Sequence, residues 1–212
     1  VIGLGCECAQ ISLYQNDSNK DKVEYLNIQD EGGTREIINN VTKKIINDLE
    51  DINSITRNNI LVSELTVALQ CGGSDSYSGI TANPALGFAS DLLIKNGGST
   101  ILAETPEIYG AEHLLIERAK KKEIVDKLIK QIEWWKHYTL INNGSLDNNP
   151  SPGNKKGGLT TILEKSLGAV AKSGTSTMMA VLDYSEKISS KGFNFMDSPG
   201  FDPISVTGQV AS

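Results

Sequence analysis

The stretch of this 212-residue chain richest in reactive side chains runs from Leu69 to Gly87 and reads LQCGGSDSYSGITANPALG. A short apolar run ends there at Cys71, and two glycines, a serine and Asp75 follow. Thiolates bind metals, carboxylates accept protons, and hydroxyl groups hydrogen-bond polar ligands. Glycines let a ligand approach the backbone closely. The stretch is therefore a candidate wall of a polar binding site.

Two of the three cysteines each end an expected strand. Cys6 and Cys71 precede small or acidic residues, which suits a metal ligand or an activated thiol. Simple packing is the alternative, because cysteine is among the most frequently buried residues. Cys8 is too close to Cys6 for a comfortable disulfide. We therefore expect reduced thiols in a cytoplasmic protein.

Several acidic residues follow expected strands or open turns, where a carboxylate can act as a general base or a hard metal ligand. Most acids in such places are helix caps or solvated, so that alternative stays open for each. The candidates are Glu7, Asp75, Glu104, Glu107 and Asp197.

A lysine-bearing loop, NPSPGNKKGGLTT, places Lys155 and Lys156 just before a glycine pair and an expected helix start. Backbone N–H groups at a helix N-terminus favour an anion, and a lysine adds positive charge. The loop therefore suits a carboxylate or a phosphate. The alternative is a linker with solvated lysines.

Strand and helix signals alternate along the chain. Helical spacing and caps predict helices from Thr34, from Asn83, over residues 110–138, and after the capping pair Thr161 and Glu164. Apolar runs predict strands at residues 1–4, 64–71, 99–104, 178–184 and 193–197.

This alternation predicts an α/β fold, Rossmann-like, with a mostly parallel sheet and helices on both faces. Ligands of such sheets gather beyond the carboxyl ends of the strands, where Cys6, Cys71 and Glu104 would meet. We expect one α/β segment over residues 1–212, with a polar loop at 142–158 that is rich in turn residues.

The amino-acid composition limits the classes of partner that we expect this protein to bind. The chain carries 20 Lys and Arg against 26 Asp and Glu, a formal net charge of −6. Nucleic-acid-binding proteins usually present a basic face, so we expect no nucleic-acid partner. No apolar run approaches the roughly 20 residues of a membrane span, so we expect no membrane partner.

Four stretches together resemble the altronate and galactarate dehydratase family, in the family's order and over nearly the whole chain. They are VIGLGCE, LQCGGSDSYSGITANPALG, ETPEIYGAEHLL and NPSPGNKKGGLTTILEKSLG. The third is closer to the altronate branch, and the galactarate dehydratases and the sulfolactate sulfo-lyase large subunits share the framework. The resemblance implies a hydro-lyase that converts a sugar acid, here altronate, to a 2-keto-3-deoxy acid. It also implies a divalent metal, typically Fe²⁺, with Mn²⁺ or another ion as the alternative.

The resemblance gives the candidate residues roles. It implies Cys6 and Cys71 as metal ligands. It implies catalytic carboxylates at Glu7, Asp75 and Glu104. The substrate-binding set is Gly72, Gly73, Ser74, Thr81, Asn154, Lys155 and Lys156.

Members of the family have more chain on both sides of these motifs. We therefore expect flanking segments of a longer protein to complete the site and the isolated segment to be inactive. A homo-oligomer is one of the assemblies open to such a protein. The competing hypothesis is a non-catalytic domain that binds sugar acids; retention of the thiols favours the enzyme.

Overall fold

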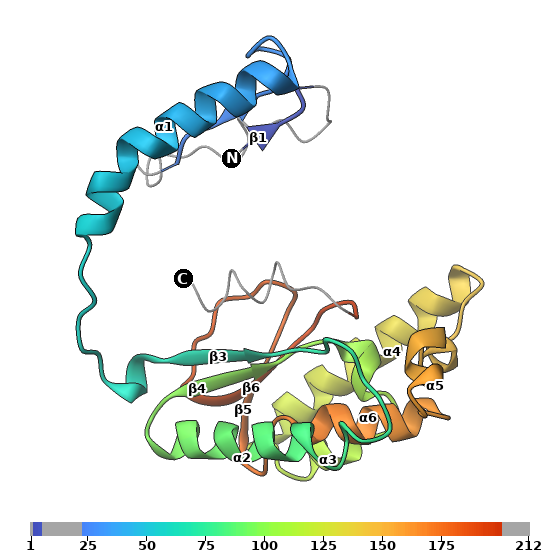
Figure 1. Cartoon of the computed structure of the whole chain (residues 1–212). Coiled ribbons are helices and arrows are strands. Elements are labelled where there is room, and N and C mark those ends of the chain that lie inside the picture. Colours follow the sequence, from blue (N-terminus) through green and yellow to red (C-terminus); the bar gives the residue numbers. More distant parts are fainter. Residues whose placement is uncertain (1, 6–22, 201–212) are drawn as a thin grey trace. The chain divides into compact units, whose positions relative to one another are not determined.

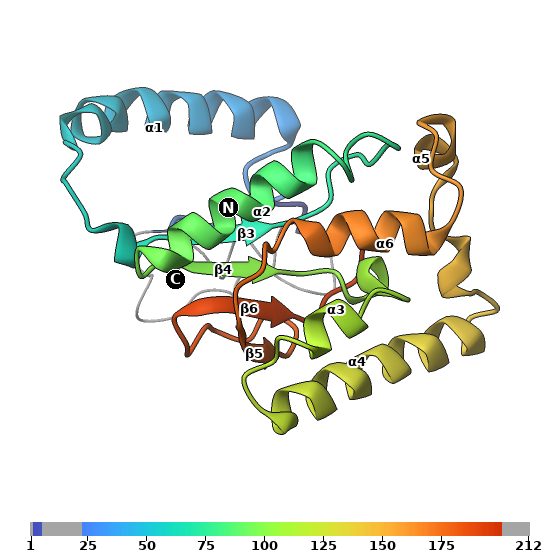
Figure 2. The same cartoon turned by 90° about the horizontal axis from the view of Figure 1, so that it is seen from below.

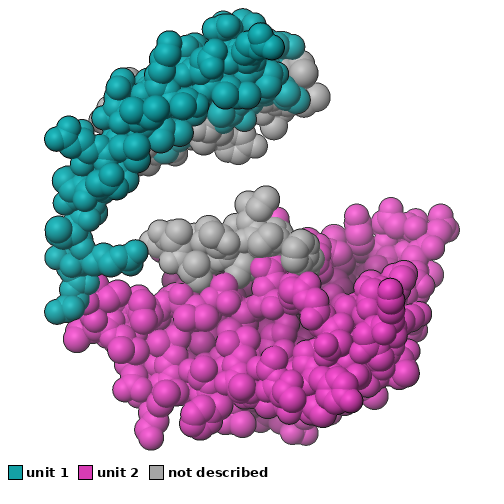
Figure 3. All heavy atoms as spheres, in the orientation of Figure 1, with its two compact units in different colours: residues 1–59 teal, residues 60–212 magenta. Residues whose placement is uncertain are grey.

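The computed structural model describes residues 2–5 and 23–200 of the chain (Figure 1). The chain divides into two compact units, residues 1–59 and 60–212, which Figure 3 colours separately. Cys6, Glu7 and Cys8 lie outside the described residues, so the roles expected for Cys6 and Glu7 stay predictions. In the described ranges, no helix has both the length and the apolar character that crossing a membrane requires.

The first unit holds a two-stranded parallel sheet and one long helix. Strand β1 (Ile2–Gly3) pairs with β2 (Leu26–Asn27). Helix α1 (Thr34–Ser54) follows Gly33, which is the N-cap with a φ of 108°, a conformation that favours glycine. The helix predicted from Thr34 is confirmed, although the cap lies one residue earlier than expected.

The second unit is built on a four-stranded, fully parallel sheet, which confirms the α/β class. The strand order is β3 (Thr66–Leu69), β4 (Ser99–Leu102), β6 (Gly192–Met196), β5 (Met178–Leu182). Register pairs Leu69 with Leu102 and Leu102 with Phe195, so the three strands end side by side. Helices flank the sheet (Figures 1 and 2).

The helices of this unit lie between successive strands, except for one short helix that precedes β3. The α-helices are α2 (Ala82–Lys95), α3 (His113–Ile116), α4 (Lys122–Ile141), α5 (Pro152–Lys156) and α6 (Ile162–Ala171). Short 3₁₀ helices are η2 (Val62–Glu64), η3 (Thr105–Ile108) and η4 (Leu146–Asn148). The stretch 142–158, expected as a polar loop, thus contains η4 and α5. Its turn residues serve as caps, since the Ser151 and Asn154 side chains form a reciprocal capping box around α5.

The prediction of a single helix over residues 110–138 is wrong, because the helical conformation is interrupted between α3 and α4. Ala119 forms a parallel bridge with Met178, whose N–H donates to the Arg118 carbonyl at 2.9 Å. The Arg118 guanidinium donates to three carbonyl groups within residues 173–176. These long-range bonds replace the helical ones that local periodicity favours.

The larger core cluster lies between the strands and the helices. It joins Leu69, Leu102 and Phe195 of the sheet to Leu128 of α4 and Val170 of α6. Burying one such side chain stabilises the fold by about 1.5–3 kcal/mol. A smaller cluster uses the alternate strand positions, with Ile101, Ala103, Leu182 and Met196.

Helices α2 and α6 lie side by side in direct backbone contact (Figure 2). A Cβ atom at Gly87 of α2 would lie 2.1 Å from the carbonyl oxygen of Ala171. Asn83, expected as an N-cap, instead donates from its buried amide to the Gly168 carbonyl at 2.9 Å. The N-cap of α2 is Thr81.

This contact generates a stability prediction. Glycine-to-alanine changes inside helices usually stabilise by roughly 0.5–1 kcal/mol, but at Gly87 the new methyl group meets backbone. We expect Gly87→Ala to lower the free energy of unfolding by about 1–3 kcal/mol, measured by urea denaturation. Gly73→Ala is the control, because nothing lies within 4 Å of its added Cβ. If Gly87→Ala lowers the free energy of unfolding no more than Gly73→Ala does, the close packing of α2 against α6 is contradicted.

Candidate active site

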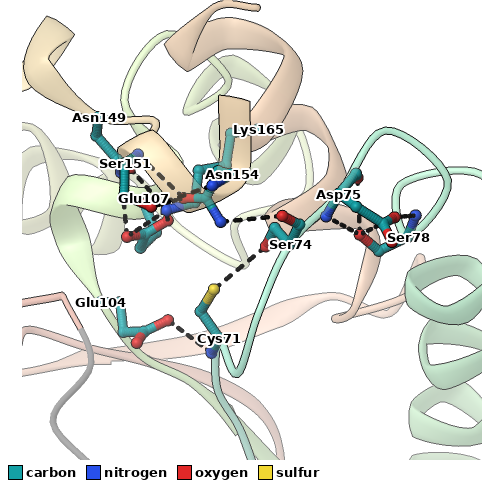
Figure 4. Close-up of polar contacts among 10 residues, drawn as sticks. All are labelled: Cys71, Ser74, Asp75, Ser78, Glu104, Glu107, Asn149, Ser151, Asn154 and Lys165. Carbon is teal, nitrogen blue, oxygen red and sulfur yellow. Dashed lines mark hydrogen bonds and ion pairs between the residues drawn. The ribbon is translucent and has the colours of Figure 1, made fainter. Parts of the chain in front are cut away.

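The ends of β3 and β4 bring Cys71 and Glu104 together, as parallel pairing predicts. The Cys71 N–H donates to Glu104 Oε2 at 2.9 Å (Figure 4). Asp183 and Asp197 follow β5 and β6 at the same edge, because all four strands are parallel. The carboxyl edge of the sheet therefore carries one thiol and three carboxylates, at Cys71, Glu104, Asp183 and Asp197.

Glu104 is held in an unusual conformation. It is 1% exposed, and its φ of 78° lies in the left-handed region that non-glycine residues rarely adopt. Its N–H donates to Ser198 Oγ at 2.9 Å, and the Thr105 N–H donates to the Ser198 carbonyl at 3.0 Å. Backbone strain of this kind costs about 1–3 kcal/mol and clusters at active sites. Glu104 is thus the strongest candidate for chemistry at this edge.

The Cys71 side chain faces the loop that follows β3. Its Sγ lies 3.2 Å from Ser74 Oγ, and the thiol is partly buried (Figure 4). Asn154 of α5 donates its amide to the Ser74 carbonyl at 2.9 Å, and the Ser76 N–H donates to the Gly157 carbonyl. The lysine-bearing segment is therefore attached to the Cys71 loop.

The structure places the rest of the predicted substrate-binding set around this loop. Gly72 and Gly73 have nothing within 4 Å of an added Cβ, so the space beside their backbone is open. Lys155 and Lys156 are exposed on α5, next to the Asn154 that bonds to the loop. Their contact with a substrate stays a prediction.

Asp75 and Thr81 make bonds within their own turn. The Asp75 carboxylate accepts from the N–H groups of Ser78 and Tyr77 at 2.8 and 2.9 Å. These bonds, with that from the Ser78 backbone foremost, lower the pKa of Asp75 below its ordinary value of 3.8. Thr81 Oγ1 donates to the Tyr77 carbonyl at 2.8 Å. Both side chains shape the loop, and their roles toward a substrate stay predictions.

A buried ion pair lies beside this site. Lys165 Nζ is 2.9 Å from Glu107 Oε2 and 3.1 Å from Oε1, and the two side chains are 6% and 9% exposed. Lys165 also donates to Asn149 Oδ1 at 2.7 Å, and Asn149 donates to Glu107 Oε1 at 3.1 Å. Figure 4 shows this group next to Asn154 and Ser74.

The sequence patterns indicate no role for Lys165 or Asn149, and they single out Glu107 only as one of several acids. A signal for Lys165 is present in its spacing. It lies three residues after Ile162 and four before Ala169, on the apolar face of its helix. A lysine at such a position has to find a buried partner.

A cavity of about 230 Å³ lies between the Ser74–Ile80 loop and α6. Ser74, Asp75, Glu164 and Lys165 supply its polar lining. A larger cavity, of about 790 Å³, lies along α4 and is walled by aromatic groups that include Trp134. The smaller cavity adjoins the Cys71 loop through Ser74, whose Oγ contacts the Cys71 thiol, and the larger one adjoins Glu104 through Ser198.

The described residues do not complete a metal site. Among them, no group of three or more His, Cys, Asp or Glu side chains is placed to hold an ion. Cys71 and Glu104 supply at most two adjoining donors. A metal at this edge would therefore need further ligands from outside the described residues.

The parallel sheet and its flanking helices define an α/β protein, and the polar groups at the carboxyl edge form its candidate site. Residues 62–212 match the family model described as D-galactarate/Altronate dehydratase, C-terminal. The chain belongs to this family, which confirms the resemblance carried by the four motifs.

Three curated relatives support this assignment to the family. Galactarate dehydratase (L-threo-forming) of Escherichia coli K12 is 38% identical over 220 residues, which cover 100% of this chain and 42% of the relative. Altronate dehydratase of Bacillus subtilis 168 is 40% identical over 215 residues, 100% of this chain and 43% of the relative. The (2R)-sulfolactate sulfo-lyase subunit beta of Chromohalobacter salexigens is 33% identical over 188 residues, which cover 86% of this chain and 48% of the relative. The chain spans less than half the length of each.

The bonds to Asp75 generate a prediction of pH dependence. Because its pKa is lowered in the fold, the carboxylate adds stability that is complete above 3.8 and is lost as pH falls through the lower folded value. We expect Asp75→Ala to reduce the free energy of unfolding at neutral pH, with the difference from wild type narrowing below about pH 4. Urea denaturation across this range measures it. A difference that stays constant with pH would contradict the turn-forming role.

Proposed function

We propose that this chain forms part of a hydro-lyase that removes water from a sugar acid, with altronate as the substrate and a 2-keto-3-deoxy acid as the product. The observation that carries the proposal is Glu104, a buried and strained carboxylate bonded to the Cys71 N–H at the carboxyl edge of the sheet. Family membership supports the same reaction class.

Dehydration requires a base, because the proton beside the substrate carboxylate has to be removed. In the proposal Glu104 accepts that proton, held in place by the Cys71 and Ser198 bonds. The enediolate that forms is dianionic and needs fixed positive groups and N–H donors. Lys155 and Lys156 supply charge for the substrate carboxylate, and the open backbone at Gly72 and Gly73 admits the substrate.

The remaining assigned groups orient the sugar chain. Ser74 and Asn154 present polar groups from one bonded pair of segments. Asp75 and Thr81 hold the turn of this loop in its conformation. They act on the substrate either through the shape of the loop or by direct hydrogen bonds to the substrate's hydroxyl groups. Glu7 completes the proposed set of carboxylates.

The choice of altronate rests on the motif ETPEIYGAEHLL. Overall identity does not separate the branches, since the galactarate enzyme is 38% identical and the altronate enzymes are 38% and 40% identical. Galactarate dehydration and sulfolactate cleavage are the alternatives within the family.

The proposal includes a divalent metal, Fe²⁺ by preference, with Cys71 and Cys6 among its ligands. Because the described residues do not complete the site, flanking segments of a longer protein would supply the rest, and the isolated chain would be inactive. We also propose a cytoplasmic location and a homo-oligomeric enzyme that binds neither nucleic acid nor membranes.

The test is turnover by the full-length protein on altronate, galactarate and (2R)-sulfolactate, with keto acid and sulfite measured in parallel. We expect keto acid from altronate. Glu104→Gln should lower kcat/KM by roughly 10²–10⁴-fold, as expected for loss of a general base. Cys71→Ser should lose both bound metal and turnover.

The control for these variants is Glu133→Gln, an exposed acid on α4 that pairs only with Lys136 among the ion pairs of the described residues. It should retain full activity. Undiminished turnover by Glu104→Gln would refute the assigned base, and sulfite release without keto acid formation from either sugar acid would move the protein to the sulfo-lyase branch.

A further inference from the structure

The Lys165–Glu107–Asn149 cluster has no role in the function proposed so far. The ammonium group is buried and meets oxygen atoms of two side chains, the Glu107 carboxylate at 2.9 and 3.1 Å and the Asn149 amide at 2.7 Å. Three segments supply the three residues: α6, η3 and the stretch that follows η4. The position of the ammonium is therefore fixed before any ligand arrives.

Stability alone is a poor explanation for this cluster. Removing two charges from water costs several kcal/mol per ion, and well-packed apolar residues in place of a buried pair are often neutral or stabilising. Buried charged groups with specific partners in a cleft are more characteristic of functional sites. The cluster is thus a candidate for chemistry.

The cluster is also connected to both parts of the candidate site. Glu107 lies one turn after Glu104 on η3, and its N–H donates to the Glu104 carbonyl at 2.9 Å. Lys165 lines the same cavity of about 230 Å³ as Ser74, whose hydroxyl contacts the Cys71 thiol. Figure 4 shows the ion pair above Cys71 and Glu104, with Ser74 bonded to Cys71 and to Asn154 beside the pair.

We propose that Lys165 is the catalytic acid of the dehydration, which rests on the proposed function. A base and an acid on separate segments are what an elimination of water requires, because hydroxide is a poor leaving group. Glu107 and Asn149 are positioning residues that hold the ammonium toward the cavity.

Glu104 takes the proton from the carbon beside the carboxylate, and that electron pair becomes the new carbon–carbon double bond. The bond from the next carbon to its hydroxyl oxygen breaks, and the oxygen takes a proton from Lys165 to leave as water. The enol then tautomerises to the keto acid. Solvent returns a proton to Lys165 and removes one from Glu104.

The experiment uses the full-length protein and two substrates: the sugar acid itself and an analogue whose departing hydroxyl is replaced by fluorine. Fluoride leaves without a proton, so it bypasses the acid but still needs the base. The variants are Lys165→Arg, which keeps the charge and the pairing but is a very weak acid, and the double variant Lys165→Met with Glu107→Leu, which leaves no buried charge unpaired. Lys172→Met, another buried lysine at the end of α6, is the control.

We expect both Lys165 variants to lose roughly 10²–10⁴-fold in kcat/KM with the hydroxyl substrate and less than about tenfold with the fluoro analogue. Glu104→Gln should lose activity with both substrates. Thermal unfolding of the double variant should match wild type to within a few degrees, which excludes misfolding as the cause.

Two results would overturn the acid role. If Lys165→Arg turns over the hydroxyl substrate within about threefold of wild type, the lysine serves only structure, and the proposed function is unaffected. Equal losses on both substrates would also refute it, because a general acid is not needed for fluoride. Wild-type inactivity on every sugar acid would overturn the proposed function and the acid role together.

Discussion

The hydrogen bond from the Cys71 N–H to the Glu104 carboxylate joins the ends of two neighbouring parallel strands. It exists because β3 and β4 pair in register, so that the residues just beyond each strand arrive at one edge together. Parallel pairing cannot arise from local contacts, since the strands are linked by the whole of α2. The site therefore depends on the packing of α2 and α6 as much as on its own residues.

The polar groups around this bond are held in place by hydrogen bonds to one another. Ser198 secures the backbone of Glu104, Ser74 contacts the Cys71 thiol, and Asn154 connects that loop to α5. Preorganised dipoles of this kind stabilise developing charge without the reorganisation that water would need. The left-handed backbone at Glu104 is maintained by these contacts, so its strain is a property of the assembled edge.

Much of this arrangement could be predicted from the sequence. Apolar runs that end in Cys71 and Glu104 predict two parallel strands, and the rule that parallel strands end at one edge brings the residues together. The break between α3 and α4 could not be predicted, because bonds from residues around Ala119 to Met178 are not visible in local periodicity.

The partners of individual side chains were the least predictable part of the site. Asp75 has the sequence context of a catalytic acid, yet its carboxylate is engaged by the N–H groups of its own turn. Lys165 lies on the apolar face of its helix, which signals burial, but only the three-dimensional structure shows that its ammonium pairs with Glu107 and Asn149. The partners of such side chains are determined by which segments pack together. Sequence spacing constrains that packing only weakly.

The most direct test of the account is a crystal structure of the full-length Glu104→Gln variant with the sugar acid bound. We expect the ligand at the carboxyl edge of β3 and β4, with the carbon beside its carboxylate facing residue 104 and the departing hydroxyl toward Lys165. A ligand bound instead in the aromatic cavity along α4, beside Trp134, with neither residue 104 nor Lys165 facing it, would exclude these two residues as the base and the acid.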